Sequence, residues 1–308
     1  MTYPSSVRIR EVGPRDGIQS ERAEVVTADK VRLIDALSSS GLRYIEAVSF
    51  VSPKAIPQMA DAREVWSEID RNSDVFYSAL VPNRRGAETA AEVAVDGMQV
   101  FIAATDSYNL NNVRRTVRDS IPDVAEVVAV ASAAGIPVEG TISTAFGCPY
   151  EGDVPPERVA DVTGWMKDVG VTSISYGDTT GMGTPRRVRE LIETLRDSHP
   201  EVELNMHFHD TRGTGLANVL TALELGVDYF DASVGGMGGS PYAAGATGNI
   251  ATEDLVHMLA DMNIVTGVDL DRLLDAARFA QGFINGDLPS KVLRAGPRWE
   301  VAGKTSNP

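Results

Sequence analysis

The segments IPVEGTIST (136–144), PPERVADVTGWMKDVG (155–170) and VTSISYGDT (171–179) follow one another along the chain and decide the fold class. The first and third are short, apolar and rich in β-branched residues, as buried parallel strands are. The second has apolar residues at helical spacing and ends in Gly170, a helix stop signal. Strand, helix and strand in this order predict a β-α-β unit, in which helices cover a parallel sheet.

The same alternation extends to both sides of this unit. Six more strand-like segments are VRIREVG (7–13), LRYIEAVSF (42–50), DVFYSALVP (74–82), MQVFIAAT (98–105), ELNMHFHD (203–210) and VDYFDASVGG (227–236). Helical patterns such as ADKVRLIDALSSSG (28–41) separate them. The total of eight strands predicts a closed α/β (β/α)8 TIM barrel, and a doubly wound open sheet is the alternative.

The domain organisation follows from the lack of a linker rich in Ser, Gly or Pro between two halves. We expect residues 1–308 to form one TIM-barrel lyase domain, with the barrel at about 7–263 and a C-terminal helical addition at about 269–291. The stretch 110–135 is expected to form one longer helical crossover.

Composition excludes several classes of protein. Of 308 residues 43% are hydrophobic and 23% charged, as in soluble globular proteins, and a net charge of -15 argues against a nucleic-acid-binding surface. Cys148 is the only cysteine, so no intrachain disulfide can form and a reducing compartment is favoured. No apolar run has the length of a signal peptide core or a membrane span. We therefore expect a cytoplasmic protein without a membrane or nucleic-acid partner.

Polar residues gather where the predicted strands end, and in a TIM barrel these ends carry the chemistry. They are Arg15 and Asp16 after the first strand, Glu46 and Ser49 on the second, Asn83 after the third, Asp178 at the end of the sixth, and His207, His209 and Asp210 on the seventh.

His207 and His209 are separated by one residue, and this spacing directs both side chains to the same face of a strand. Two core histidines satisfied by hydrogen bonds are the alternative interpretation. Asp16 ends the first strand, which neighbours later strands once the barrel closes, and adds a hard anionic oxygen. Mixed nitrogen and oxygen ligands favour Mg²⁺ or Mn²⁺ over structural zinc, for which thiolates are lacking.

Two further features have competing interpretations. The segment GGMGGSPYAAGATGN (235–249) is rich in Gly and Ala, which indicates a mobile lid or, alternatively, only a permissive surface loop. Cys148 is expected to be a small buried hydrophobic residue.

Several longer motifs identify a family. They are VGPRDGIQSE (12–21), IEAVSFVSPKAIPQM (45–59), GCPYEG (147–152), GDTTGMGTP (177–185), HFHDTRGTGLANVLTALELG (207–226) and GNIATEDLVHML (248–259). In this order they resemble 3-hydroxy-3-methylglutaryl-CoA lyase, of the DRE-TIM metallolyase superfamily, over nearly the whole chain. The resemblance implies a divalent-metal-dependent carbon–carbon lyase that cleaves an acyl-CoA to acetyl-CoA and a keto acid.

The resemblance also implies roles for individual residues. Asp16, His207, His209 and Asn249 would bind the metal, and Arg15 would neutralise the thioester enolate oxygen. Glu46 and Asp178 would orient Arg15 and the catalytic water or base. The remaining candidates for the substrate site are Gln19, Ser49, Thr141, Tyr176, Arg22 and Lys54, the last two as phosphate partners.

The sequence departs from the family at Ser240, where the family's loop carries a catalytic cysteine. A serine hydroxyl is a much weaker acid than a thiol, whose pKa is about 8.5, so Ser240 cannot simply inherit that role. Thr141 and Tyr176 also differ from the family's expected side chains beside the acyl group. In the C-terminal segment Asn285 and Lys291 are candidates for CoA binding, whereas Asp287 stands where a basic residue is expected.

The sequence leaves three hypotheses open. The first is the lyase, with an acyl-CoA substrate and a homo-oligomeric assembly, a dimer or larger. The second is an aldolase or Claisen-type condensing enzyme acting on a 2-oxo acid. The third is a barrel that binds acyl-CoA without turnover, because fold alone does not determine function.

Overall fold

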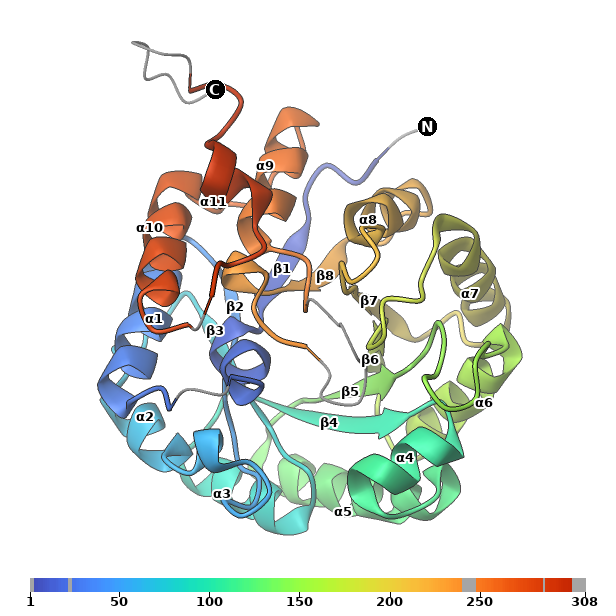
Figure 1. Ribbon diagram of the computed structural model, residues 1–308. Helices are drawn as coiled ribbons and strands as arrows, with labels where there is room; N and C mark the ends of the chain where they lie inside the picture. Colours follow the sequence, from blue (N-terminus) through green and yellow to red (C-terminus); the bar gives the residue numbers. More distant parts are fainter. Residues whose placement is uncertain (1–2, 22–23, 240–247, 285, 301–308) are drawn as a thin grey trace.

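The computed structural model describes residues 3–21, 24–239, 248–284 and 286–300. Within them eight parallel strands pair in sequence order and close into a barrel through β1 and β8 (Figure 1). The strands are β1 Arg8–Glu11, β2 Tyr44–Ser49, β3 Phe76–Leu80, β4 Gly97–Ala103, β5 Val138–Ser143, β6 Ser173–Gly177, β7 Glu203–His207 and β8 Tyr229–Ala232. This confirms the TIM barrel and excludes the open sheet.

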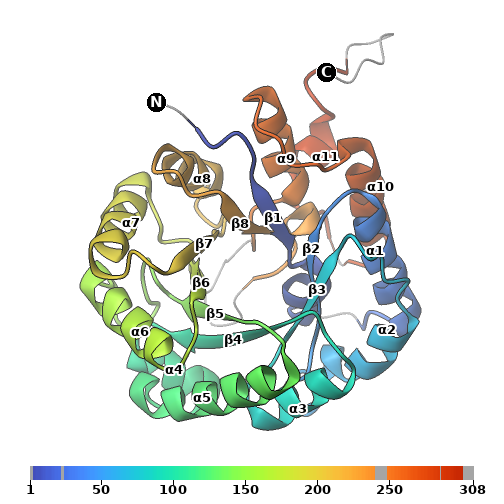
Figure 2. The same ribbon diagram turned by 180° about the vertical axis from the view of Figure 1, so that it is seen from behind.

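Helices surround the barrel on the outside, as the view from behind also shows (Figure 2). They are α1 Thr27–Ser39, α2 Ala62–Glu68, α3 Arg84–Glu92, α4 Asp106–Val113, α5 Val117–Ala134, α6 Pro156–Asp168, α7 Pro185–Ser198, α8 Gly215–Glu224, α9 Thr252–Asp261, α10 Leu270–Gln281 and α11 Lys291–Ala295. Gly41 and Gly170, the expected stops after α1 and α6, have φ of 92° and 101°. Only glycine adopts such angles without strain, which is why the two helices end there.

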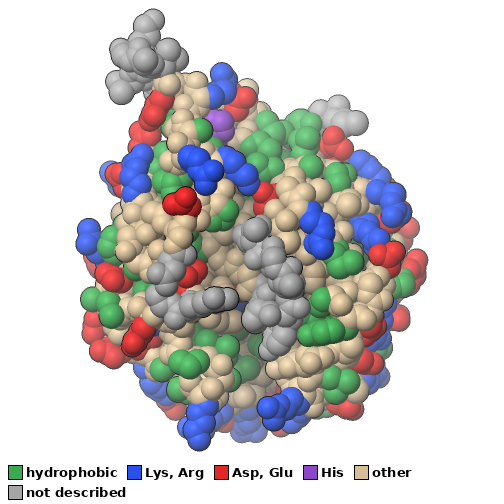
Figure 3. All heavy atoms as spheres, in the orientation of Figure 1, with side chains coloured by type: hydrophobic (Ala, Val, Ile, Leu, Met, Phe, Trp, Pro, Cys, Tyr) green, Lys and Arg blue, Asp and Glu red, His purple; other side chains and the backbone are tan. Residues whose placement is uncertain are grey.

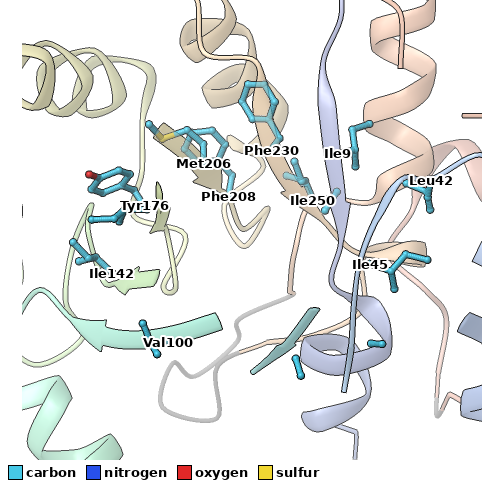
Figure 4. Packing of buried hydrophobic residues seen from close by; sticks show 14 of the residues in the cluster. Ile9, Leu42, Ile45, Val100, Ile142, Tyr176, Met206, Phe208, Phe230 and Ile250 are labelled. Atoms are coloured by element: carbon cyan, nitrogen blue, oxygen red, sulfur yellow. The ribbon is translucent and has the colours of Figure 1, made fainter. Parts of the chain in front are cut away.

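Alternation along each strand separates two environments. Outward side chains such as Ile9, Ile142 and Phe230 are fully or almost fully buried between the strands and the helices (Figure 4). Inward positions on the same strands carry polar residues, among them Arg10 and Asp231. The outer layer therefore forms the apolar core, while the inside of the barrel is largely polar.

The stretch 110–135 is not one helix, and this prediction was wrong. α4 ends at Val113, Arg114 has a left-handed backbone with φ of 60°, and α5 begins at Val117. The Thr116 side chain accepts a hydrogen bond from the backbone N–H of Asp119 and so caps the new helix. The apolar periodicity of the two helices hid the break between them.

The C-terminal helices pack beside the start of the barrel, where α10 contacts α1 (Figure 1). α10 occupies the first half of the expected addition at 269–291, while α11 starts only at Lys291. The carboxylate of Asp254 on α9 accepts hydrogen bonds from the backbone N–H groups of Lys291 and Val292, which fixes the start of α11. Among the described residues, none of the helices combines the length and apolarity needed to cross a bilayer.

Candidate metal centre

Three side chains converge at the carboxyl ends of β1 and β7. Asp16, His207 and His209 each offer one ligand atom, and these atoms lie within 4.8 Å of one another. The Nε2 atoms of the two imidazoles are 3.2 Å apart, so both rings face the same point. The same-face prediction for the His-x-His pair is confirmed, and a metal ion fits this set of nitrogen and oxygen donors.

Asp16 reaches the site from a turn and not from the strand itself. β1 ends at Glu11, and Gly13–Gly17 form the π-helical turn η1. The expectation that Asp16 ends the first strand was therefore wrong by five residues. This helical turn satisfies its own backbone groups, since the N–H of Asp16 bonds to the carbonyl of Val12 at 2.7 Å, and it brings the Asp16 side chain beside the histidines.

Asn249 completes the arrangement. Its Nδ2 donates to Asp16 Oδ2 at 2.8 Å and to the Met237 carbonyl at 2.9 Å, whereas its Oδ1 is buried without a partner. A buried amide oxygen without a donor is costly, and a cation at this position would satisfy it. Oxygen donors from Asp16 and Asn249 beside two imidazoles suit a hard or borderline divalent ion.

The electrostatics of Asp16 and His209 favour the protonation states that a metal needs, whereas Asp231, against the effect of burial, raises the pKa of His207. Burial alone would raise the pKa of Asp16, but the charge of Arg15, followed by that of His207, lowers it below its usual range. Burial, together with the charge of His207, lowers the pKa of His209 to about 3. Asp16 is thus an anion and His209 a neutral ligand at neutral pH.

Arg15 bridges the candidate metal ligands to β2. Its Nη1 donates to Asp16 Oδ1 at 2.8 Å and its Nη2 to Glu46 Oε2 at 2.7 Å, while its Nε is buried without a partner. Glu46 is 1% exposed, and its Oε1 has no partner either. The two carboxylates fix the orientation of the guanidinium, and its Nε–H donor remains available, which is the arrangement an anion-stabilising group requires.

Asp178 lies next to His207, because its backbone N–H bonds to the carbonyl of His207 at 2.8 Å. Its Oδ1 accepts from the backbone N–H of Gly183 at 2.9 Å, and its Oδ2 is buried without a partner. Burial raises the pKa of Asp178 to about 7. A carboxyl group of this kind can take up and release a proton near neutral pH.

The other substrate candidates fall into different places. Thr141 faces the barrel interior, since it alternates with outward Ile142 and pairs with Ser175 on β6. Ser49 is fully buried at the end of β2, and Gln19, after η1, has a buried Oε1 without a partner. These three positions are compatible with the predicted pocket.

Tyr176 does not lie in that pocket, and this assignment needs correction. Its side chain points outward among Ile142 and Met206 (Figure 4), and its hydroxyl contacts Thr163 of α6 at 3.2 Å. The residue is fully buried there. Strand alternation explains the error. Successive side chains of β6 point to opposite sides, so Tyr176 points outward while Ser175 and Gly177 occupy inward positions.

The described candidates for binding phosphate and CoA lie at the surface. Lys54 is exposed, and Lys291 donates to Asp210 Oδ2 at 2.5 Å. Arg22, Ser240 and Asn285 lie outside the described residues, as does most of the Gly-rich segment expected to be a lid. On the face shown in Figure 3, Lys and Arg side chains alternate with Asp and Glu around the edge.

Two smaller predictions concern residues near these loops. Cys148 is buried, as expected, with its sulfur 3.1 Å from the hydroxyl of Thr105. Asn83, one of the polar strand-end residues, caps α3 by accepting a hydrogen bond from Gly86 N–H at 3.1 Å.

A cavity of about 280 Å³ adjoins the metal centre. Asn249, Asp210, Ala251, Pro289 and Lys291 are among its lining residues. It therefore connects the candidate metal ligands with the C-terminal segment that carries α11.

A group of polar residues below the histidines was not predicted from the sequence. They are Arg10, Glu139, Ser175, Asn205 and Asp231, all facing the barrel interior and connected by hydrogen bonds. They could have been predicted, because each is a polar residue at an inward position of a largely apolar strand. His207 Nδ1 lies 3.0 Å from Asp231 Oδ2, so this group touches the metal centre directly.

Comparison with known proteins adds independent information. The sequence profile of the HMGL-like family matches residues 6–280. A hydroxymethylglutaryl-CoA lyase from Bacillus subtilis is 45% identical over 294 residues, covering 96% of this chain and 98% of the relative. A 3-hydroxy-3-isohexenylglutaryl-CoA/hydroxymethylglutaryl-CoA lyase from Pseudomonas aeruginosa is 44% identical, covering 96% and 99%. An HMG-CoA lyase structure from Acinetobacter baumannii, in complex with coenzyme A and 3-methylmalate, superposes with a TM-score of 0.92 at 40% identity, covering 98% of each chain.

Proposed function

This chain belongs to the HMGL-like family of carbon–carbon lyases. We therefore propose that it cleaves 3-hydroxy-3-methylglutaryl-CoA, or a related thioester with another branch at C3, to acetyl-CoA and a keto acid. The observation that carries the proposal is the convergence of Asp16, His207 and His209 beside Arg15. No other cluster of candidate ligands occurs among the described residues.

Enzymes of this family depend on a divalent metal ion. We propose Mg²⁺ or Mn²⁺ here, held by Asp16, His207, His209 and Asn249. When bound, the ion supplies a Lewis acid that polarises the substrate hydroxyl and a neighbouring oxygen. The unpartnered Oδ1 of Asn249 and the facing imidazole nitrogens support this ligand set.

The chain's own residues account for the movement of protons and charge. In the reaction the C3 hydroxyl loses its proton, the C2–C3 bond breaks, and the electron pair moves to C2, which is then protonated. Asp178 is suited to accept the hydroxyl proton, since one of its oxygens has no partner and its pKa is about 7. Arg15, held in position by Glu46, neutralises the developing charge on the thioester oxygen.

Recognition of the CoA portion is assigned to the cavity beside Asn249. Lys291 at its edge provides a cation in a protein of strongly negative net charge, and Asp210 holds it in position. We propose that the acyl-CoA chain enters here. Lys291→Ala should raise KM with little change in kcat, and an unchanged KM would remove Lys291 from binding.

The identity of the acid that protonates the enolate depends on position 240. We propose that Ser240 marks an enzyme adapted to another acyl branch, a view supported by the short Thr141 side chain in the barrel interior. Ser240→Cys should then raise cleavage of hydroxymethylglutaryl-CoA by less than about tenfold, which is about 1.4 kcal/mol of barrier. A much larger gain, with no better substrate among those tried, would indicate a weakened parent activity.

The proposed activity is tested by incubating the purified protein with Mn²⁺ or Mg²⁺ and a panel of 3-hydroxy-3-alkylglutaryl-CoA thioesters. Mass spectrometry should detect acetyl-CoA from at least one of them, and a chelator should abolish its formation. Condensation of a 2-oxo acid with acetyl-CoA would instead identify a synthase. Binding of thioesters without any product would identify a barrel that only binds acyl-CoA.

We also propose that residues 1–308 act as one domain and assemble as a homo-oligomer. Light scattering of the purified protein would measure the assembly, and a monomer at micromolar concentration would contradict it.

A further inference from the structure

Five polar side chains form a layer beneath the histidines, which we call the floor network. Its members are Arg10 of β1, Glu139 of β5, Ser175 of β6, Asn205 of β7 and Asp231 of β8. Arg10 and Asp231 are 3% and 2% exposed, and Ser175 and Asn205 are fully buried. Taking two opposite charges out of water is expensive unless their hydrogen bonds are satisfied. The free-energy cost of burying the floor network must therefore be offset by its hydrogen bonds, or the network must serve a function.

Asp231 is the centre of this network. Its Oδ1 accepts from Arg10 Nε at 2.9 Å and Asn205 Nδ2 at 2.8 Å. Its Oδ2 accepts from Arg10 Nη2 at 2.8 Å and Ser175 Oγ at 2.9 Å. The two parallel bonds from Arg10 fix the plane of the carboxylate, because a guanidinium fork matches a carboxylate in only one orientation.

The remaining partner of Asp231 is His207. Oδ2 lies 3.0 Å from His207 Nδ1, and the backbone register places the two residues directly opposite each other on β7 and β8. A carboxylate can only accept, so Nδ1 must carry the proton. In the neutral imidazole the lone pair is then on Nε2, the atom that faces His209.

We propose that Asp231, oriented by Arg10, is a positioning residue that selects the Nδ1–H tautomer and the ring orientation of His207 for metal binding. This inference rests on the proposed metal centre and goes beyond its ligands. Hydrogen-bond partners behind a ligating histidine typically change metal affinity by roughly 10–100-fold. Arg10 contributes to this positioning because its two hydrogen bonds orient the Asp231 carboxylate. Glu139 forms an ion pair with the Nη1 atom of Arg10.

The tautomer can be measured without metal. The chain has only four histidines, so long-range ¹H–¹⁵N spectra of the histidine-labelled, metal-free protein at alkaline pH resolve each ring. We expect the Nδ1–H form for His207 in the wild type. Observation of the Nε2–H form there would overturn the proposal even if the metal site is correct.

The metal affinity is measured by calorimetry with Mn²⁺. Asp231→Asn should bind Mn²⁺ roughly 10–100-fold more weakly than the wild type. The matched control is Asp228→Asn, which removes a carboxylate paired with the partly exposed Arg8 of β1 at 3.2 Å, without touching His207. Its affinity should stay within about twofold of the wild type.

A second variant covers the case in which Asp231→Asn fails to fold. The triple substitution Arg10→Met, Glu139→Gln and Asp231→Leu removes all three charges of the network together and leaves no carboxylate without its cation, a change that folded proteins often tolerate. It should fold, lose the tautomer preference of His207 and bind Mn²⁺ at least about tenfold more weakly. A folded variant that keeps both the Nδ1–H form and wild-type affinity overturns the proposal. Failure of the wild type itself to bind Mn²⁺ overturns the proposed metal centre, while the tautomer measurement still decides the role of Asp231.

Discussion

The floor network and the cluster above it are built from the same chemistry and differ in how completely they are satisfied. We call the upper group, Arg15, Asp16, Glu46, His207 and His209, the rim cluster. In the floor, both oxygens of Asp231 are fully occupied by donors, and Asn205 Oδ1 is the one buried polar atom of the network's five side chains without a partner. In the rim, buried polar atoms of Arg15 and Glu46 have no partner.

This difference indicates which of the two layers can bind a ligand. A satisfied ion pair is rigid and holds its neighbours, whereas buried groups with missing partners cost free energy that a ligand can recover. In the floor, Arg10, against the effect of burial, lowers the pKa of Asp231, whereas beside the rim cluster burial raises the pKa of Asp178 to about 7. The floor is therefore a support, and the rim is the reactive layer.

The largest expected effect comes from removing a rim carboxylate. Asp16→Ala should abolish Mn²⁺ binding and turnover, because two imidazoles alone cannot hold a labile hard ion. Calorimetry measures the binding. Asp61→Asn, which removes a carboxylate paired with Lys30 outside the barrel, is the control and should bind normally. Normal Mn²⁺ affinity in Asp16→Ala would locate the site elsewhere.

The next largest effect is expected when the planar guanidinium of Arg15 is replaced by an ammonium group. Arg15→Lys should reduce kcat by roughly 10²–10³-fold, since an ammonium cannot contact both Asp16 and Glu46 and still face the substrate oxygen. Mn²⁺ affinity should change little, which separates catalysis from metal binding. Wild-type kcat in this variant would remove Arg15 from the mechanism.

A smaller loss is expected at the proposed base. Asp178→Asn keeps the hydrogen bond from Gly183 N–H but cannot accept a proton, so kcat should fall by about 10²-fold while Mn²⁺ affinity stays within about threefold. Steady-state kinetics and calorimetry measure the two quantities. A parallel loss of metal affinity would show that Asp178 acts on the ligands instead.

The smallest effect concerns stability and extends the comparison to a third buried carboxylate. Glu253 of α9 accepts from Gly235 N–H through both oxygens at 3.0 Å, has no cation partner among the described residues, and has a pKa raised by burial to about 7. The folded protein therefore binds more protons than the unfolded chain from about pH 4.5 to 7. The free energy of unfolding should fall as the pH rises through this window.

Glu253→Gln should flatten this fall by roughly 1–2 kcal/mol, measured by denaturant unfolding at pH 5 and pH 8 in the presence of a chelator. An equally steep fall in the variant would assign the pH dependence to other groups, of which Glu11, with a pKa also raised to about 7, is the first to test.

Much of this architecture was predictable because its signals are local. Short β-branched segments alternating with helical patterns predicted the barrel, and the spacing of His207 and His209 alone predicted a shared face. The predicted identity of the family came from long motifs in a fixed order. Two predictions failed for local reasons. The stretch 110–135 is broken by one residue with a left-handed backbone, and Tyr176 occupies an outward instead of an inward position on its strand.

What the sequence by itself determined is the class of fold, the family and the residue types able to bind a metal, because periodicity and motif order are properties of neighbouring residues. Only the tertiary structure decided which side chains meet. Closing the barrel brings Arg10 and Asp231 together although 221 positions separate them, and it places both below His207. Such contacts depend on strand register and on the inward or outward direction of each side chain, which no local pattern records.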